Sequence, residues 1–244
     1  MRIYFEGMYY SADSSKADLL YLQNKCPEKY RQLFPKVMSE TKLIKGNSVY
    51  QVYFDERSKE SLDNGFMPYK NGVTHNYEND VILDIWRRRD WINADYVGVV
   101  SWRFYEKTGL SSADLKPKSD IMVIFPQNYE KYEHPFSRKG YISVDKMVQL
   151  ADKHKLFQFK LKRAKIKQQV WCNYWIARPE VFDEYCTNYL SKAVEFFKDK
   201  PEYELMEMHR GKLTPAMTFF LEGLFSVFLS KSKYTYEVKR NTVL

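Results

Sequence analysis

The fold is decided by the stretch DYVGVVSWRF, which spans Asp95–Phe104. Its middle is an unbroken run of apolar, largely β-branched residues, which is typical of a buried strand. We therefore predict a central strand over Asp95–Arg103. Ligands of open α/β sheets bind at the carboxyl ends of the strands, so we expect functional side chains directly after this run.

Strand and helix patterns alternate on both sides of this stretch. Further strand patterns occupy Met1–Phe5, Ser48–Phe54, Asp120–Phe125 and Gln168–Ile176. Helix patterns occupy Tyr77–Arg87, Ser143–Lys153, Pro179–Ala193 and Ala216–Leu229. The polar, turn-rich segment Asp55–Asn76 is predicted to be a long loop. This alternation predicts an α/β fold, with a mostly parallel central sheet flanked by helices.

Length and composition favour one folded domain over residues 1–244. The chain is 44% hydrophobic and 17% aromatic, which argues against disorder. It has no repeat and no obvious linker. No run approaches the roughly 18 apolar residues that span a bilayer, and the first residues lack a signal-peptide pattern. Cys26, Cys172 and Cys186 form no CxxC pair. We therefore expect unpaired thiols and a cytoplasmic protein.

The charge balance favours anionic partners. Lys and Arg number 39 against 31 Asp and Glu, a net charge of +8. Seven of these cations, and no acid, lie within Lys153–Lys167. This segment could contact a membrane surface peripherally or bind nucleic acid. The alternatives are a solvated loop, or an edge strand with one charged face.

Several enzyme classes lack their motifs in this chain. There is no glycine-rich dinucleotide fingerprint, no P-loop, no G-x-S-x-G and no H-E-x-x-H. The four histidines are scattered along the chain. These absences weigh against dehydrogenases, P-loop kinases, typical α/β-hydrolases and histidine-based metal sites.

Two charged residues stand at informative positions. Arg103 ends the predicted central strand, where a guanidinium can hold a diphosphate through paired hydrogen bonds. The alternative is an ordinary surface arginine. Glu222 lies inside the apolar run Thr218–Phe225, where a carboxylate needs a partner or a function. It could act as a general base or hold a sugar hydroxyl, or it could form a buried ion pair, for instance with Arg210.

Three blocks of the chain resemble a bacterial family labelled capsular or exopolysaccharide biosynthesis proteins. The first block is the helix pattern Tyr77–Arg87 with Asn93–Arg103 after it. The second is Cys172–Ile176 leading into Phe182–Cys186, and the third is Phe220–Leu229. Their order and rough spacing match that family between Tyr77 and Leu229. The resemblance implies a GT-A-like, Rossmann-related glycosyltransferase fold.

The resemblance also implies an activity and a set of site residues. The expected enzyme moves a hexose from a nucleotide sugar, most plausibly a UDP-sugar, to a glycan or a lipid-linked acceptor. Arg103 and Glu222 are its expected catalytic residues, with Arg103 offsetting leaving-group charge. Donor contacts are expected from Ser101, Arg103, Tyr105, Glu78 and Asn173.

The chain departs from the family pattern at several positions. Ser101 and Phe104 replace a histidine and an arginine of the strand block, and Gly223 replaces an arginine. No Asp-x-Asp pair follows the central strand, where GT-A enzymes usually hold a metal on the donor diphosphate, so metal dependence stays open. Two other functions stay open as well: a basic protein that binds nucleic acid or another anionic polymer, and an inactive transferase-like assembly partner.

Overall fold

The computed structural model describes residues 2–5, 8–11, 46–72, 75–89, 91–125, 135–136, 140–209 and 211–241. The chain divides into two compact units, residues 1–44 and 45–244. In the first unit, β1 (Arg2–Phe5) pairs antiparallel with β2 (Met8–Ser11). The strand predicted at Met1–Phe5 is therefore confirmed, whereas a single domain over residues 1–244 stays a prediction.

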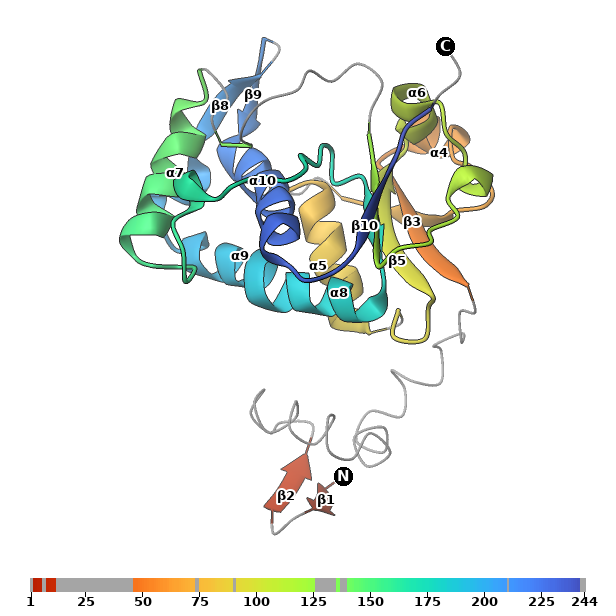
Figure 1. The fold of residues 1–244 in the computed structure, drawn as a ribbon, viewed down its shortest axis with the longest axis horizontal. Coiled ribbons are helices and arrows are strands. Elements are labelled where there is room, and N and C mark those ends of the chain that lie inside the picture. Colours follow the sequence, from red (N-terminus) through yellow and green to blue (C-terminus); the bar gives the residue numbers. More distant parts are fainter. Residues whose placement is uncertain are drawn as a thin grey trace. The chain divides into compact units, whose positions relative to one another are not determined.

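The second unit is built on a six-stranded sheet (Figure 1). Across the sheet the strands are β10 (Tyr236–Lys239), β6 (Ile121–Ile124), β7 (Trp175–Ala177), β5 (Tyr96–Ser101), β3 (Asn47–Tyr53) and β4 (Met67–Lys70). Parallel pairs join β10 to β6, β5 to β3 and β3 to β4. Only β7, among these six, runs antiparallel to its neighbours. The predicted α/β class with a mostly parallel sheet is confirmed.

The predicted central strand is β5, which is buried at all six positions. It ends at Ser101, earlier than predicted, because the chain turns there into α6 (Phe104–Thr108). Gly98 allows β7 to approach closely, since a Cβ at this position would lie 2.6 Å from the carbonyl oxygen of Trp175. The side chains after β5 are therefore presented by a turn and a helix.

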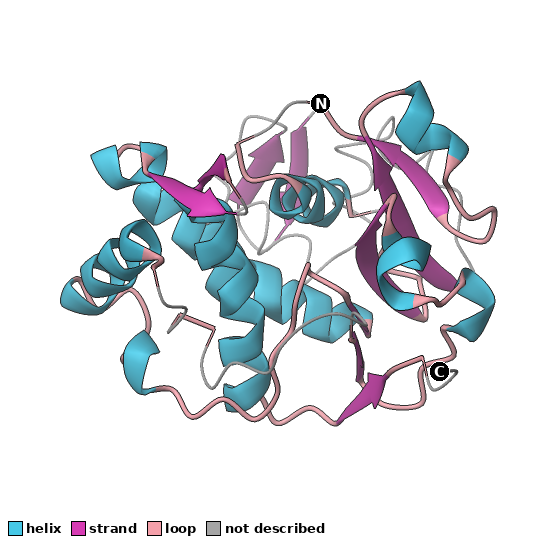
Figure 2. Ribbon diagram, turned by 90° about the horizontal axis from the view of Figure 1, so that it is seen from above, coloured by secondary structure: helices cyan, strands magenta, loops and turns pink. Residues whose placement is uncertain are grey.

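Helices cover both faces of the sheet (Figures 1 and 2). The larger core lies against α5 (Glu78–Arg88), α7 (Ile142–Lys153), α8 (Pro179–Tyr185), α9 (Ser191–Phe197) and α10 (Ala216–Lys231). In it, the rings of Trp175 and Phe225 stack with centroids 4.0 Å apart. On the opposite face, Val100 and Tyr174 pack with Phe104 of α6 in a smaller core.

Three expectations are wrong in part. The strand predicted over Gln168–Ile176 is confined to β7, because the backbone before it turns through left-handed conformations. The segment predicted as a long loop contains α4 (Glu56–Glu60) and the sheet strand β4. The basic segment Lys153–Lys167 is no edge strand: beyond the end of α7 it has one short helical turn, Leu161–Arg163, and its seven cations are exposed.

A hairpin of β8 (Met206–His209) and β9 (Lys212–Pro215) precedes α10. Neither the hairpin nor β10 was predicted from the sequence. Within the described residues, no helix has the length and apolar character needed to cross a membrane.

Candidate functional site

A cleft opens where β3 and β5 end side by side. The two strands are parallel, with Val52 opposite Ser101, so both chains leave the sheet at the same edge. The cleft encloses about 820 Å³ of empty space, part of it open to solvent. It is lined by Phe54, Asp55, Arg57, Ser58, Trp102, Arg103 and Glu106. We call it the strand-end cleft.

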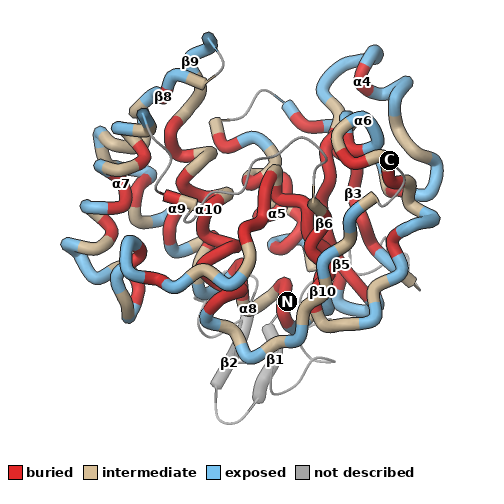
Figure 3. The backbone as a smooth tube through the Cα atoms, turned by 45° about the horizontal axis from the view of Figure 1, so that its top comes forward, coloured by how far each residue is buried: buried red, intermediate tan, exposed pale blue. Residues whose placement is uncertain are grey.

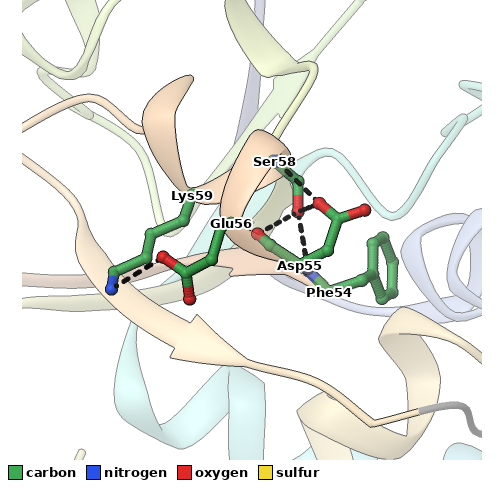
Figure 4. Close-up of polar contacts among 5 residues, drawn as sticks. All are labelled: Phe54, Asp55, Glu56, Ser58 and Lys59. Carbon is green, nitrogen blue, oxygen red and sulfur yellow. Dashed lines mark hydrogen bonds and ion pairs between the residues drawn. The ribbon is translucent and has the colours of Figure 1, made fainter.

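One wall of this cleft is set by the start of α4 (Figure 4). The Oδ1 atom of Asp55 accepts hydrogen bonds from the backbone N–H of Ser58, at 2.8 Å, and from its hydroxyl, at 2.6 Å. The Oγ of Ser58 accepts from the backbone N–H of Asp55 in return. The Ser58 hydroxyl, followed by its N–H, lowers the pKa of Asp55. This reciprocal cap starts the helix and leaves the ring of Phe54 38% exposed at the cleft.

The opposite wall carries Trp102 and Arg103. The guanidinium of Arg103 forms a two-point ion pair with the carboxylate of Glu106, one contact being Nε to Oε2 at 2.7 Å. It also lies 5.8 Å from the centroid of the Trp102 ring. The hydrogen bond from Arg103 lowers the pKa of Glu106. Because this pair is exposed, it costs little to rearrange when a stronger anion enters the cleft.

Deeper along the same edge lies an inner cluster of Glu78, Lys107, Cys172, Asn173 and Tyr174. Lys107 follows Arg103 by one turn of α6, and its Nζ lies 3.7 Å from the Sγ of Cys172 and 5.6 Å from the Tyr174 ring centroid. It forms no ion pair with any carboxylate in the described part of the chain. Loss of hydration raises the pKa of Glu78, and the Lys107 charge opposes that rise. The cluster therefore holds a half-buried cation close to a half-buried acid.

The backbone around this cluster adopts costly conformations. Tyr77, Cys172 and Asn173 have φ angles of 50°, 58° and 53°, in the region that favours glycine. Asn173 is buried, and its Nδ2 donates to the Oδ1 of Asn79 at 3.2 Å. Its own Oδ1 has no hydrogen-bond partner among the described residues. Such strain and such an unpaired oxygen concentrate at ligand sites, where a bound group can use them.

Glu222 of α10 reaches the inner cluster from the other side. Its Oε1 accepts a hydrogen bond from the backbone N–H of Cys172. It also lines a small hollow with Tyr141, Trp171 and Phe219. Its proposed ion-pair partner, Arg210, lies outside the described residues. A side chain at the neighbouring Gly223 would require the ring of Phe136 to move, because a Cβ there would lie 2.4 Å from it.

The structure brings most of the predicted site residues to one edge of the sheet. Arg103 lines the strand-end cleft, Glu78 and Asn173 belong to the inner cluster, and Glu222 bonds to that cluster. Tyr105 is exposed and lines a neighbouring hollow with Gln51 and Asp63.

Ser101 is placed differently from the other predicted residues. It is buried, and its Oγ lies 2.5 Å from the hydroxyl of Tyr174. This contact places Ser101 behind Tyr174, where it supports the ring in the wall of the inner cluster. Ser101 therefore does not line the strand-end cleft.

Phe54, Arg57, Trp102 and Lys107 are among the residues of this edge that were not predicted from the sequence as site residues. A signal existed for Phe54, which ends a predicted strand, and for Trp102, which lies within the decisive stretch. Lys107 was not predicted because the strand was expected to continue through Arg103. No helix was therefore expected to place Arg103 and Lys107 on the same face.

The residues at the cleft do not fit a metal ion. The carboxylates of Asp55 and Glu106 already accept hydrogen bonds from Ser58 and Arg103. Where the chain is described, no three side chains of His, Cys, Asp or Glu gather so as to hold a metal. Of the charged side chains that follow β5, Arg103 and Lys107 are cations, and the carboxylate of Glu106 pairs with Arg103.

The cysteines match the expectation as far as they are described. Neither Cys172 nor Cys186 forms a disulfide within the described residues, and Cys26 lies outside them. Burial raises the pKa of Cys186 well above its ordinary value, so this thiol stays protonated in the core.

The chain shows little similarity to known proteins. No protein-family model matches the chain, and no curated protein matches it. A solved structure of WbbM, described as a bifunctional glycosyltransferase, is similar with a TM-score of 0.47 and 13% identity. The likeness covers 80% of this chain, which spans 44% of that one. Membership of the capsular family stays a prediction.

Proposed function

We propose that this chain is a glycosyltransferase that moves a hexose from a nucleotide sugar to a glycan or a lipid-linked acceptor. The observation that carries the proposal is the composition of the strand-end cleft. Two aromatic side chains, Phe54 and Trp102, and two arginines, Arg57 and Arg103, line it where adjacent parallel strands end. A nucleoside diphosphate presents matching features, a flat base and a short run of phosphates. UDP is the nucleotide that the sequence resemblance favours.

In this proposal the cleft binds the donor nucleotide. The base stacks on Phe54 or Trp102, a contact that every base can make through its π-face. The diphosphate takes the guanidinium of Arg103 from Glu106, because a doubly charged phosphate is the stronger acceptor. Arg57 on α4 adds a second cation from the facing wall.

Two cations of α6 then stabilise the leaving group. When the bond between the sugar and the diphosphate breaks, negative charge grows on the departing phosphate. Arg103 is the N-cap residue of α6 and Lys107 lies one turn later, so both can face that charge. Fixed charges of this kind are often the largest single contribution to catalysis.

The inner cluster and α10 provide the sugar and acceptor contacts of the proposal. The unpaired Oδ1 of Asn173 accepts a hydrogen bond from a hydroxyl of the transferred sugar. Glu222, beside the aromatic rings of Tyr141 and Phe219, orients the acceptor hydroxyl or takes its proton. Bonding to the N–H of Cys172 fixes the carboxylate of Glu222 next to the inner cluster.

A ligand screen followed by a turnover assay tests this function. Thermal shifts are measured with nucleoside diphosphates and with their sugar conjugates, since a bound ligand raises the melting temperature by mass action. Nucleoside diphosphate release from the stabilising donor is then followed, with and without glycan acceptors. A shift together with release supports the proposal. A shift without any release supports the inactive, transferase-like partner.

A second candidate function rests on the seven exposed cations of Lys153–Lys167. Their apolar neighbours, such as Phe157 and Leu161, are buried, so the segment presents mainly charge to the solvent. This favours an anionic polymer or the surface of a membrane as partner. Affinity for nucleic acid would fall steeply with salt, whereas donor turnover would change little.

A further inference from the structure

The basic segment Lys153–Lys167 is anchored to the core along its length. The side chains of Phe157, Leu161 and Ala164 are buried in the larger core. The backbone N–H of Leu161 also donates to the Oδ1 of Asp152, in the last turn of α7, at 2.7 Å. The exposed cations of the segment are Lys153, Lys155, Lys160, Lys162, Arg163, Lys165 and Lys167. Because an anchored backbone displays them, less conformational freedom is lost when a partner binds.

Most of this positive charge is not neutralised by the protein itself. Lys162 pairs with Asp145 of α7. The other cations of the segment form no ion pair with a carboxylate in the described part of the chain. Lys231 of α10, whose Nζ lies 4.9 Å from the ring centroid of Phe159, adds a further exposed cation beside the segment. The segment therefore suits a partner that carries several negative charges.

Beyond Lys167 the chain follows α10 towards Glu222. Three of its backbone N–H groups donate to side-chain oxygens that lie one helical turn apart on α10. These bonds join Lys167 to Ser230 at 2.9 Å, Val170 to Ser226 at 2.9 Å, and Cys172 to Glu222. The rise of an α-helix from Glu222 to Ser230 is about 12 Å. Lys167 and the carboxylate of Glu222 thus stand at the two ends of one short path.

The segment also approaches the hollow at Glu222 along α7. The backbone N–H of Asp145, the partner of Lys162, donates to the carbonyl oxygen of Tyr141 one turn earlier, at 3.1 Å. Tyr141 and Val170 both line the hollow that contains Glu222. Helices α7 and α10 pack against each other (Figure 3). The cations therefore lie beside the hollow in which the proposed acceptor hydroxyl would react.

The surroundings of the cations indicate the class of partner. The apolar side chains of the segment are buried or packed against the core, so none is free to enter the acyl region of a bilayer. The hollow offers the aromatic rings of Tyr141 and Phe219 beside one carboxylate, which suits sugar rings and hydroxyl groups. We propose that the basic segment binds an acidic glycan, a sugar chain bearing carboxylates, whose terminal sugar lies in the hollow at Glu222. Since this names the acceptor of the transfer, it rests on the proposed function.

Fluorescence anisotropy of the full chain with a labelled hyaluronan hexasaccharide tests the charge requirement. This probe alternates uronate with uncharged sugars, and chitohexaose is an uncharged chain of equal length. Lys165→Gln/Lys167→Gln removes two cations of the segment, and Lys116→Gln/Lys118→Gln removes two equally spaced, exposed lysines ahead of β6. We expect the first variant to bind the hexasaccharide about tenfold more weakly than wild type, and with a smaller salt dependence. The second variant should bind it like wild type, and chitohexaose should bind wild type about tenfold more weakly than the hexasaccharide.

Phe219→Leu tests whether the glycan reaches the hollow. It removes an aromatic ring that lies away from the basic segment, so attraction between charges alone would leave the affinity for the hexasaccharide unchanged. We expect that affinity to fall about fivefold or more, with an unchanged melting temperature.

Three results would overturn the proposal. The first is an equal loss in both lysine variants, which would mean general charge attraction, and the second is unchanged affinity in Phe219→Leu. The third is tighter binding of single-stranded DNA or phosphatidylglycerol vesicles that depends on Lys165 and Lys167, which would assign the segment to a nucleic acid or a membrane. Calorimetric affinity for UDP, measured on the same proteins, is expected to be unchanged throughout. Its absence in wild type would refute the donor site, a result distinct from any failure to bind the glycan.

Discussion

The Nζ of Lys107 lies 3.7 Å from the Sγ of Cys172, which joins α6 to the left-handed turn that leads into β7. Through this contact, α6 touches Cys172, whose backbone N–H also donates a hydrogen bond to Glu222. Residues more than a hundred positions apart in the sequence thus gather at one edge of the sheet. Their arrangement, with cations near the strand ends and a carboxylate behind them, underlies the predictions below.

Lys107→Met should lower turnover. Methionine keeps the length of the side chain and removes the charge that we assign to the leaving group, so donor turnover should fall about tenfold to a hundredfold. The melting temperature should change little, because Lys107 forms no ion pair with the described residues. Lys198→Met, which removes the same charge from an exposed pair with Glu195, is the matched control. Equal turnover in the two variants would remove Lys107 from the site.

Glu78→Gln should raise the melting temperature at neutral pH. Loss of hydration raises the pKa of Glu78 in the folded protein above its ordinary 4.5, so the folded state holds this proton more tightly than the unfolded state. Ionised Glu78 therefore costs stability above its folded pKa, and the cost disappears as the pH falls below 4.5. Melting curves from neutral pH to below pH 4.5 should show a higher melting temperature for Glu78→Gln than for wild type. The difference should shrink as the pH falls.

The opposite trend is expected at Glu106, whose pKa is lowered by Arg103. Glu106→Gln should lower the melting temperature slightly at neutral pH. This difference should vanish in acid, where the wild-type carboxylate is protonated. If Glu78→Gln instead lowers the melting temperature at neutral pH, the ionised carboxylate of Glu78 is stabilised by a partner and is not destabilised by burial.

Phe54→Ala should weaken nucleotide binding through the base. Stacking of a base on an aromatic ring contributes about 1–3 kcal/mol, so affinity for a nucleoside diphosphate should fall about fivefold to a hundredfold. Affinity for inorganic pyrophosphate, which has no base, should stay unchanged. Calorimetric titrations with both ligands separate the two contributions. An equal loss for both would mean that Phe54 acts by shaping α4.

The long periodic elements of this fold could be predicted from the sequence, and the short exposed ones could not. Burial of a whole apolar face produces the patterns of β5, α5 and α10. Strand β4 and the hairpin leave no such pattern, because backbone pairing and contacts with distant residues hold them in place. Likewise, no local signal marks the left-handed conformations of Cys172 and Asn173, which shorten β7 and shape the site.

The candidate site divides in the same way. Arg103 was predicted because it follows a strand, and Glu222 because an acid in an apolar helix needs a partner. Lys107 and Arg57 escaped notice because they lie on short helices, α6 and α4, whose existence depends on tertiary packing. Position along a strand is readable from sequence, whereas the face that a five-residue helix presents is not.

Glu222→Gln separates a catalytic from a structural role. If the carboxylate acts on the acceptor, turnover falls while nucleotide affinity and melting temperature stay close to wild type. If the carboxylate only anchors the turn at Cys172, the melting temperature falls, because the amide oxygen of glutamine is a weaker acceptor for the Cys172 N–H. The turnover of the folded protein is then unchanged. Measuring all three quantities on the same preparation decides between the roles.

Calorimetric titration of UDP into wild type, Arg103→Ala and Arg178→Ala tests the donor cleft most directly. Arg178 matches Arg103 closely: both side chains are 46% exposed, and both pair with a carboxylate and lie near an aromatic ring. We predict that Arg103→Ala loses about 1.5–3 kcal/mol of binding free energy, roughly tenfold to a hundredfold in affinity, while Arg178→Ala binds like wild type. Equal affinity in all three proteins, or no binding by wild type of any nucleoside diphosphate with or without manganese, would contradict a nucleotide site in the strand-end cleft.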